Sequence, residues 1–321
     1  MAITYPIKNW AYITDGQIKY LLKLVNESIF NSQGEIDIYD QVWNYLNYRW
    51  LYISNNDWLL YSKDKMQVAF NMGLKARIDK GDDYIFAVFS KNDSSYTQEW
   101  RLLGFAIRGK DTQIVTNIGA TSINIDLSED ESSPVLSPAP PAKFCFSFGF
   151  NHLFKDDKKR WKRFPKNILN TFNDLENNSM QRAFLCSLIK FAILNDNENI
   201  SEYCRMENGE KRVTTSFDPD KFLKCLNFKD EDESIPKKDR VLNELPVSYM
   251  YPINIQNSKR PDCAMVFRKK GRGEYTQFIG KTILTLSAAQ MNARICHPDL
   301  EDTWLSNENV KNENVNRNYE K

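Results

Sequence analysis

The feature that most constrains the fold is a run of three apolar segments, separated by turn residues, that leads into a short helix. The segments cover residues 245–255, 263–268 and 275–286, and they contain many of the β-branched and aromatic residues that favour strands. Residues 287–295, SAAQMNARI, are mostly small and fit a helix. Three consecutive strands that lead into a helix predict a sheet with packed helices.

The first 74 residues predict a separate, smaller part. Residues 14–16, Thr-Asp-Gly, supply N-cap chemistry, and apolar residues recur at helical spacing over residues 17–30. A second helix begins near Asp37, and residues 57–74 hold two apolar runs around a polar turn, which predicts a hairpin. Two helices and a hairpin outline a winged helix, a module that binds nucleic acid in some proteins and has structural or protein-binding roles in others. Neither helix has the basic face of a groove-binding helix.

Residues 75–305 predict the main body. Strand-like runs occupy residues 84–90, 100–109 and 112–119, and an acidic, proline-rich loop follows at 128–142. Another helix fits residues 180–194, in which Ala183, Phe184, Leu188 and Ile189 can face a core. The polar residues 306–321 predict a disordered tail. We therefore expect an α+β protein with an amino-terminal winged-helix-like part, followed by a mixed sheet with packed helices.

The charge balance excludes a global electrostatic field as the basis of binding. The formal net charge is +1, so affinity for polyanions must come from local basic patches. The six cysteines show no metal-ligand spacing and there are two histidines, so we expect free thiols in a reducing cytosol and no bound metal. The sequence identifies no cofactor. The amino terminus lacks the features of a secretory signal, and no apolar run reaches the ~20 residues of a membrane helix, so we expect a cytoplasmic protein with no membrane partner.

Four short motifs resemble those of a known family. They are AFNMGL (69–74), ELPVSYMYPINI (244–255), GKTILTLSAAQMNAR (280–294) and HPDLEDTWL (297–305). In this order they are similar to the FNTGL, LLPL, TILTLDMAYNNARL and RPDSEWL patterns of the bacterial domain of unknown function 3825 family, and the resemblance spans nearly the whole chain. It implies no particular activity. Relatives occur beside RNA-binding modules such as cold-shock domains, which implies a connection with RNA.

The chain departs from this family pattern in three places. Residues 208–217, NGEKRVTTSF, stand where the family has an Asn-Tyr-Lys-Thr-Ala-like segment. Ser287 stands in place of an aspartate, and Gln290 in place of a tyrosine. If those family residues serve a catalytic site, this protein has an altered or lost activity.

The stretch RKKGRGEYTQFIGKTILTLSAAQMNAR, residues 268–294, holds the first candidate site. Arg268, Lys270 and Arg272 surround a glycine-containing turn, and Lys281 begins the next strand segment. Glycine lets backbone amides approach a phosphate, and the basic side chains would neutralise its charge. The alternative is a solvated hairpin tip whose charges keep an edge strand from pairing with other chains.

Two polar residues of the following helix form a second candidate. Asn292 and Arg294 lie in a helix that is otherwise small and apolar, so they must either face the core with partners or line a cleft. In a cleft, the Arg294 guanidinium could hold one phosphate in a bidentate fork.

Residues 155–164, KDDKKRWKRF, form the third candidate. Arg160 and Arg163 flank Trp161, and basic residues interleaved with aromatic ones can hold a single nucleic-acid strand by charge and stacking. The alternative is a charged surface loop with its aromatic residues in the core. The aspartates at 156 and 157 weaken the local positive field.

Acid–base chemistry has weaker candidates in Asp262, Glu244 and the pair His297 and Asp299. His-Pro-Asp is a turn composition, which favours a capping Asp299 and a partly exposed His297. No nucleophile elbow is present in the sequence. We expect a protein that binds RNA or a nucleotide, with a role in RNA processing or in stress or defence. Two alternatives stay open: a nucleic-acid-processing or phosphoryl-transfer enzyme, and a scaffold that binds a protein partner.

Overall fold

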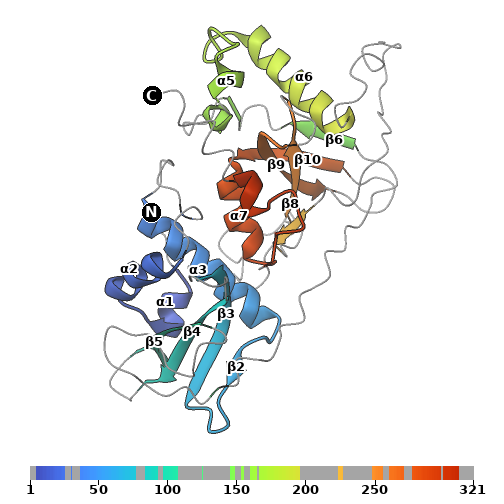
Figure 1. The fold of residues 1–321 in the computed structure, drawn as a ribbon. Coiled ribbons are helices and arrows are strands. Elements are labelled where there is room, and N and C mark those ends of the chain that lie inside the picture. The colour runs from blue at the N-terminus through green and yellow to red at the C-terminus, as the bar shows by residue number, and fades with distance from the viewer. Residues whose placement is uncertain are drawn as a thin grey trace. The chain divides into compact units, whose positions relative to one another are not determined.

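The structure is a computed structural model in which two compact units are distinguished (Figure 1). Unit 1 comprises Met1–Val135 and Arg294–Asp299, and unit 2 comprises Leu136–Ala293 and Leu300–Lys321. The residues described are 5–25, 30, 37–76, 84–92, 97–107, 125, 145–148, 153–154, 160–164, 166–195, 223–226, 248–255, 260–270, 277–297 and 299–310. Predictions for residues 112–119, 128–142 and 208–217 lie outside these ranges.

Unit 1 begins with the short elements α1 (Ile7–Trp10) and β1 (Ala11–Tyr12), followed by α2 (Asp15–Leu24). A capping box starts α2, because the Thr14 hydroxyl accepts from the Gln17 amide and the Gln17 side chain accepts from the Thr14 amide. The expected helix is therefore confirmed, but its predicted end at residue 30 is wrong. Val25 has extended backbone angles and forms a β-bridge with Ala76, so a tertiary contact ends the helix at Leu24.

The second expected helix is confirmed as α3 (Ile38–Asn55). Asp37 is its N-cap and accepts from the Tyr39 amide at 2.9 Å. The helix buries Val42 and Leu46, as its apolar spacing predicts.

The strands of unit 1 are β1, β2 (Leu60–Tyr61), β3 (Gln67–Lys75), β4 (Tyr84–Lys91) and β5 (Trp100–Ile107). They form one sheet in the order β1-β5-β4-β3-β2, in which only β1 and β5 are parallel. The predicted hairpin is confirmed as β2–β3. A winged helix is not shown, because β3 also pairs with β4 and so belongs to the interior of the sheet. The expected boundary at residue 74 falls inside β3.

The two faces of this sheet carry different apolar residues. Ala69, Phe86, Val88 and Ala106 pack with Ile125 on one face. On the other, Phe70 stacks on Phe89 with ring centroids 5.7 Å apart, and the Trp10 ring meets Phe89 edge-on at 4.9 Å.

Unit 2 contains a second five-stranded sheet in the order β6-β10-β9-β8-β7. Its strands are β6 (Cys145–Phe148), β7 (Leu223–Leu226), β8 (Ser248–Ile253), β9 (Cys263–Lys270) and β10 (Gln277–Leu284). The order confirms the predicted sequence of three strands that lead into a helix, which is α7 (Leu286–Arg294). β6 joins β10 in parallel, and the other pairings are antiparallel.

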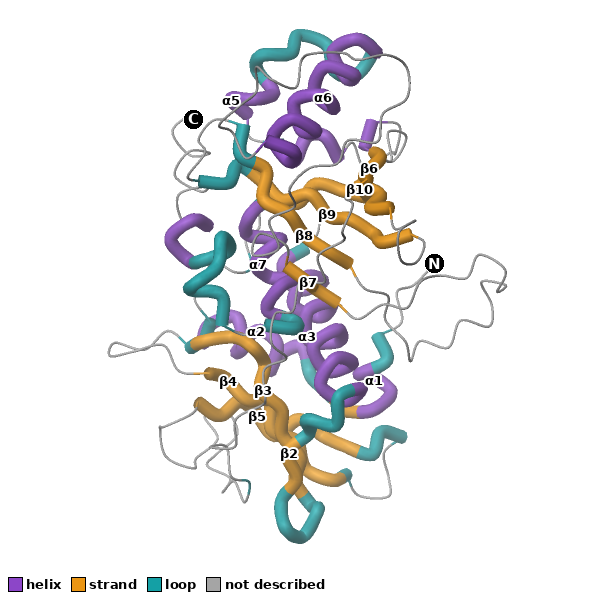
Figure 2. The backbone as a smooth tube through the Cα atoms, turned by 90° about the vertical axis from the view of Figure 1, so that its right-hand side faces the viewer, coloured by secondary structure: helices purple, strands orange, loops and turns teal. Residues whose placement is uncertain are grey.

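Residues of alternate parity in β9 point to the two faces of this sheet. Cys263, Met265 and Phe267 belong to a core shared with α6 (Ser179–Asn195). Ala264 belongs to a second core, to which α7 and residues 300–310 contribute Leu286, Ala289, Leu300, Leu305 and Val310. Figure 2 shows α6 and α7 on opposite sides of this sheet. The start of the predicted tail therefore includes a buried residue, Val310.

The predicted core face of α6 is wrong in part. Leu185 and Ile189 are buried, whereas Ala183 is exposed and Phe184 is 60% exposed. The helix is apolar on more than one side, so the 3.6-residue spacing does not select which side meets the sheet. No helix among the described residues is both long and apolar enough to cross a membrane.

Candidate functional site

The strands predicted at residues 263–268 and 275–286 are confirmed as an antiparallel pair in unit 2. β9 and β10 pair from Gln277 opposite Lys270 to Leu284 opposite Ala264. Arg268 is half-buried and lies opposite Ile279 on β10 and Ser248 on β8. Residues 271–276 join the strands and lie outside the described residues, so the prediction for Arg272 is not tested. For Lys270 the strand position is described and the side chain is not.

β10 is interrupted by a β-bulge at Lys281. Gly280 lies opposite Phe267 and Thr282 lies opposite Val266, so Lys281 is the extra residue on its strand. The Lys281 side chain is half-buried. β6 pairs with β10 only as far as Gly280, so β6 ends where the bulge begins.

The basic and aromatic run of residues 155–164 meets the same strand. Its last residues form a 3₁₀-helix, η2 (Arg160–Arg163). The Arg163 guanidinium donates to the Thr282 hydroxyl at 3.4 Å and to the Ile283 carbonyl at 3.2 Å. Two predicted sites that are far apart in sequence therefore lie side by side, because Thr282 follows Lys281 directly.

The two residues before Arg163 combine an aromatic ring with a cation. Trp161 is partly buried against the core that contains Phe164. Lys162 is exposed, and its Nζ lies 5.6 Å from the centroid of the Trp161 ring. The side chain of Arg160 is not described. Chemically, this arrangement combines a partly exposed aromatic ring with a neighbouring positive charge, the kinds of group that stack on bases and attract phosphate.

A buried polar cluster occupies unit 1, where α3 meets β3. Arg49 is fully buried, and it donates from Nε to the Asn71 carbonyl at 2.8 Å and from Nη1 to the Ile295 carbonyl at 2.7 Å. Tyr45, one turn earlier on α3, donates to the Met72 carbonyl at 2.6 Å. These bonds offset the cost of burying a guanidinium and a phenol.

The AFNMGL motif owes its shape to this cluster. The register of β3 against β4 breaks between Asn71 and Lys75, and Gly73 lies within the break with a φ of +68°. The Asn71 side chain accepts from the Gly73 amide at 2.8 Å, which closes the local turn. Residues 69–74 therefore form an irregular strand segment whose backbone approaches residues 294–295 closely.

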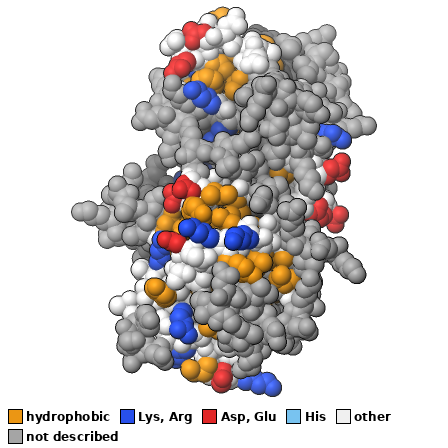
Figure 3. Space-filling view, turned by 60° about the vertical axis from the view of Figure 1, so that its left-hand side comes forward, with side chains coloured by type: hydrophobic (Ala, Val, Ile, Leu, Met, Phe, Trp, Pro, Cys, Tyr) orange, Lys and Arg blue, Asp and Glu red, His pale blue; other side chains and the backbone are white. Residues whose placement is uncertain are grey.

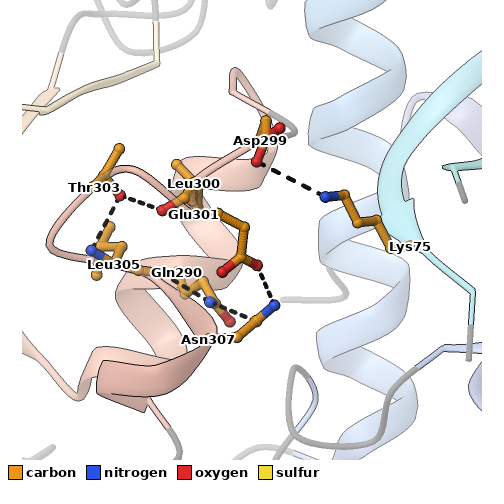
Figure 4. Close-up of polar contacts among 8 residues, drawn as sticks. All are labelled: Lys75, Gln290, Asp299, Leu300, Glu301, Thr303, Leu305 and Asn307. Carbon is orange, nitrogen blue, oxygen red and sulfur yellow. Dashed lines mark hydrogen bonds and ion pairs between the residues drawn. The ribbon is translucent and has the colours of Figure 1, made fainter. Parts of the chain in front are cut away.

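The predicted site residue Arg294 is 2% exposed, and its backbone carbonyl lies 3.5 Å from the Tyr45 hydroxyl. Asn292 is half-buried. Lys75 forms a 3.8 Å ion pair with Asp299, whose side chain is 66% exposed (Figure 4). His297 is 7% exposed, so the expectation of a partly exposed histidine is wrong.

Gln290 of α7 is a buried polar residue that motif reasoning treated only as a departure from a family pattern. It is 0% exposed, and its amide nitrogen donates to the Leu305 carbonyl at 2.8 Å and to the Asn307 side chain at 3.0 Å. Asn307 in turn donates to the Glu301 carboxylate (Figure 4). This network holds residues 301–307 against α7. The signal in the sequence is the position of this glutamine. It lies one helical turn from Leu286 and Ala293, which are both buried in the apolar core.

The acid–base candidates are engaged in turns or lie outside the described residues. The Asp262 carboxylate accepts from the Ile255 amide at 2.6 Å, and its own amide donates to the Ile253 carbonyl at 2.7 Å, so Asp262 closes the β8–β9 connection. Glu244 is not described. Arg294 belongs to unit 1, whereas Lys281 and Asp262 belong to unit 2.

Metal and disulfide chemistry find no support within the described residues. They contain no group of three or more His, Cys, Asp or Glu residues that could hold a metal ion. Cys186, Cys263 and Cys296 are free thiols, as expected, and the last two are buried. Burial raises the pKa of the Cys186 thiol to about 11, so this half-buried cysteine is a weak nucleophile at neutral pH.

Comparison of the chain with protein-family models, curated proteins and solved structures found no match.

Proposed function

We propose that this protein binds single-stranded RNA through unit 2, at η2 and the bulged part of β10. The observation that carries the proposal is the contact of Arg163 with Thr282 and Ile283, which brings Trp161 and Lys162 to the strand that contains Lys281. In the proposed complex the Trp161 ring stacks on a base, and Lys162 and Lys281 neutralise phosphates.

A single strand is the favoured form because an unpaired base is needed for stacking on a ring. On the face drawn in Figure 3, lysine and arginine side chains lie beside hydrophobic ones and beside acidic ones. The preference for RNA rests on the resemblance to a family whose relatives occur beside RNA-binding modules.

The resemblance itself is also part of this proposal. We infer that the chain is a divergent relative of the domain of unknown function 3825 family. In support, residues of three of its four motifs meet within unit 1. Asn71 and Gly73 come from the first motif, Arg294 ends the third, and Asp299 of the fourth pairs with Lys75, the residue that follows the first motif.

The test is binding of a fluorescently labelled single-stranded RNA to the full chain, measured by anisotropy over a series of salt concentrations. We expect Lys162→Glu and Trp161→Ala to weaken binding and Lys63→Glu to leave it unchanged. Lys63 is a matched control, because it is also exposed but lies in the β2–β3 turn of unit 1. Affinity for wild type should fall steeply with salt. Absent or salt-independent binding would overturn the proposal, and equal binding of DNA of the same sequence would remove its preference for RNA.

A second candidate function is favoured by the exposed tip of the β2–β3 hairpin. Tyr61 and Met66 are each 51% exposed there. We infer that α2, α3 and this hairpin act as a winged-helix-like module that contacts a protein partner through the tip. Binding of such a partner should be lost in the double variant Tyr61→Ala, Met66→Ala and retained in Lys162→Glu. The reverse pattern would reject this role.

A further inference from the structure

Arg163 makes contacts that differ from those of a phosphate ligand. Its Nη1 atom donates to two acceptors on β10, the hydroxyl of Thr282 and the carbonyl of Ile283, and the side chain is half-buried. Both contacts hold η2 to a strand of the same unit. From the sequence, Arg163 was predicted to bind phosphate like the other basic residues of 155–164. In the structure Arg163 is half-buried, whereas its neighbour Lys162 is exposed.

The contact lies where β10 has fewer strand partners. β6 pairs with Gln277–Gly280 and with no later residue of β10, so among the described strands residues 281–284 have only β9 beside them. A strand edge needs donors for its carbonyls and protection from other chains. At Ile283 the Nη1 atom of Arg163 supplies that donor.

The hydrogen bonds of Arg163 hold η2 in place jointly with the packing of Trp161 and Phe164 on the unit 2 core. Trp161 is partly buried at the margin of the unit 2 core. The Lys162 Nζ atom lies 5.6 Å from the centroid of its ring. The 3₁₀-helix has four residues, which is too short to be stable without tertiary contacts. Arg163 therefore joins the described end of the basic and aromatic run to the sheet.

We propose that Arg163 is a positioning residue: it fixes η2 on β10 so that Trp161 and Lys162 lie in the geometry that binds RNA, and its own guanidinium does not contact phosphate. This inference rests on the proposed function, since it assigns a role within the same site.

Salt dependence separates positioning from direct contact. Each phosphate contact to a single strand contributes about 0.7 to the slope of log affinity against log salt concentration. We expect Arg163→Met to lower affinity on the order of tenfold at every salt concentration with an unchanged slope. Lys162→Gln should reduce the slope by about 0.7. An equal reduction of the slope in Arg163→Met would overturn the inference.

Two further variants guard against misfolding as an explanation. Arg163→Lys keeps the charge on a shorter and more flexible side chain that does not reach both acceptors, so it should behave like Arg163→Met. Full binding by this variant would show that charge alone is needed. Thr282→Val removes one acceptor on β10 and changes no charge. It should weaken RNA binding to a smaller extent, again with an unchanged slope, and unaltered binding would count against the role of the contact.

A readout without RNA keeps this inference distinct from the proposed function. The chain has seven tryptophans, so 5-fluorotryptophan labelling with ¹⁹F NMR can follow Trp161 once its signal is assigned from Trp161→Phe. We expect Arg163→Met to shift or broaden that signal and Lys63→Glu to leave it in place. An unchanged signal would overturn the positioning role. If the wild-type chain binds no RNA, the proposed function fails, whereas the ¹⁹F result still decides whether Arg163 holds η2.

Discussion

A Cβ atom at Gly73 would lie 2.6 Å from the carbonyl oxygen of Arg294. The two residues are more than 200 positions apart in the sequence, yet their backbones are in contact within unit 1. Glycine is required at position 73 for two reasons. A side chain would clash with the Arg294 carbonyl, and the φ of +68° is a backbone conformation that residues with a side chain rarely adopt.

We therefore predict that Gly73→Ala destabilises the protein by about 1–3 kcal/mol or more, because strained backbone angles alone cost that amount. Urea unfolding followed by circular dichroism measures the change. Gly16→Ala is the control, since a Cβ there would meet only the Thr14 hydroxyl at 3.8 Å and alanine suits the first turn of a helix. A Gly73→Ala protein as stable as Gly16→Ala would contradict the described close approach.

Arg49 should be more important for stability than its neighbour Tyr45. Arg49→Met leaves the carbonyls of Asn71 and Ile295 without this donor, and a buried acceptor that loses its partner costs about 1–3 kcal/mol. Tyr45→Phe removes the bond to Met72 and should cost about half as much. Arg101→Met is the control, because Arg101 is an exposed residue of β5. Equal stabilities of Arg49→Met and Arg101→Met in urea unfolding would contradict the stabilising role of the Arg49 hydrogen bonds.

Cys186 gives a prediction about alkaline pH. Burial raises the pKa of its thiol from the ordinary 9.0 to about 11, so between these values the unfolded chain loses a proton that the folded chain keeps. The free energy of unfolding contributed by Cys186 is therefore constant below pH 9 and falls as the pH rises from 9 to about 11.

The variant Cys186→Ser lacks this titration. Relative to wild type, it should gain stability in urea unfolding as the pH is raised through that range, whereas Ser187→Ala, a change at the exposed neighbouring residue, should follow wild type. A constant difference between Cys186→Ser and wild type over this pH range would show that the folded-state pKa is not raised.

Local sequence signals predicted where helices and strands form better than they predicted where a helix ends or which of its sides is buried. The capping residues Thr14 and Asp37 marked two helix starts because a cap needs only residues within one turn. The end of α2 was missed because the bridge of Val25 to Ala76 is a contact between distant residues. The side of α6 that meets the sheet was misassigned at Phe184, because its apolar residues leave more than one side suitable for burial.

The candidate site shows the same division. Spacing and composition alone identified the β9–β10 hairpin, the basic and aromatic run and the polar positions of α7. Whether these features meet depends on packing between residues that are distant in sequence: Arg163 donates to Thr282, and Arg49 donates to the Ile295 carbonyl. A guanidinium can pair with phosphate or with a backbone carbonyl, and its sequence neighbours do not distinguish the two. The sequence determined which chemical groups this protein carries, and the tertiary structure decided which of them hold its fold and which face solvent.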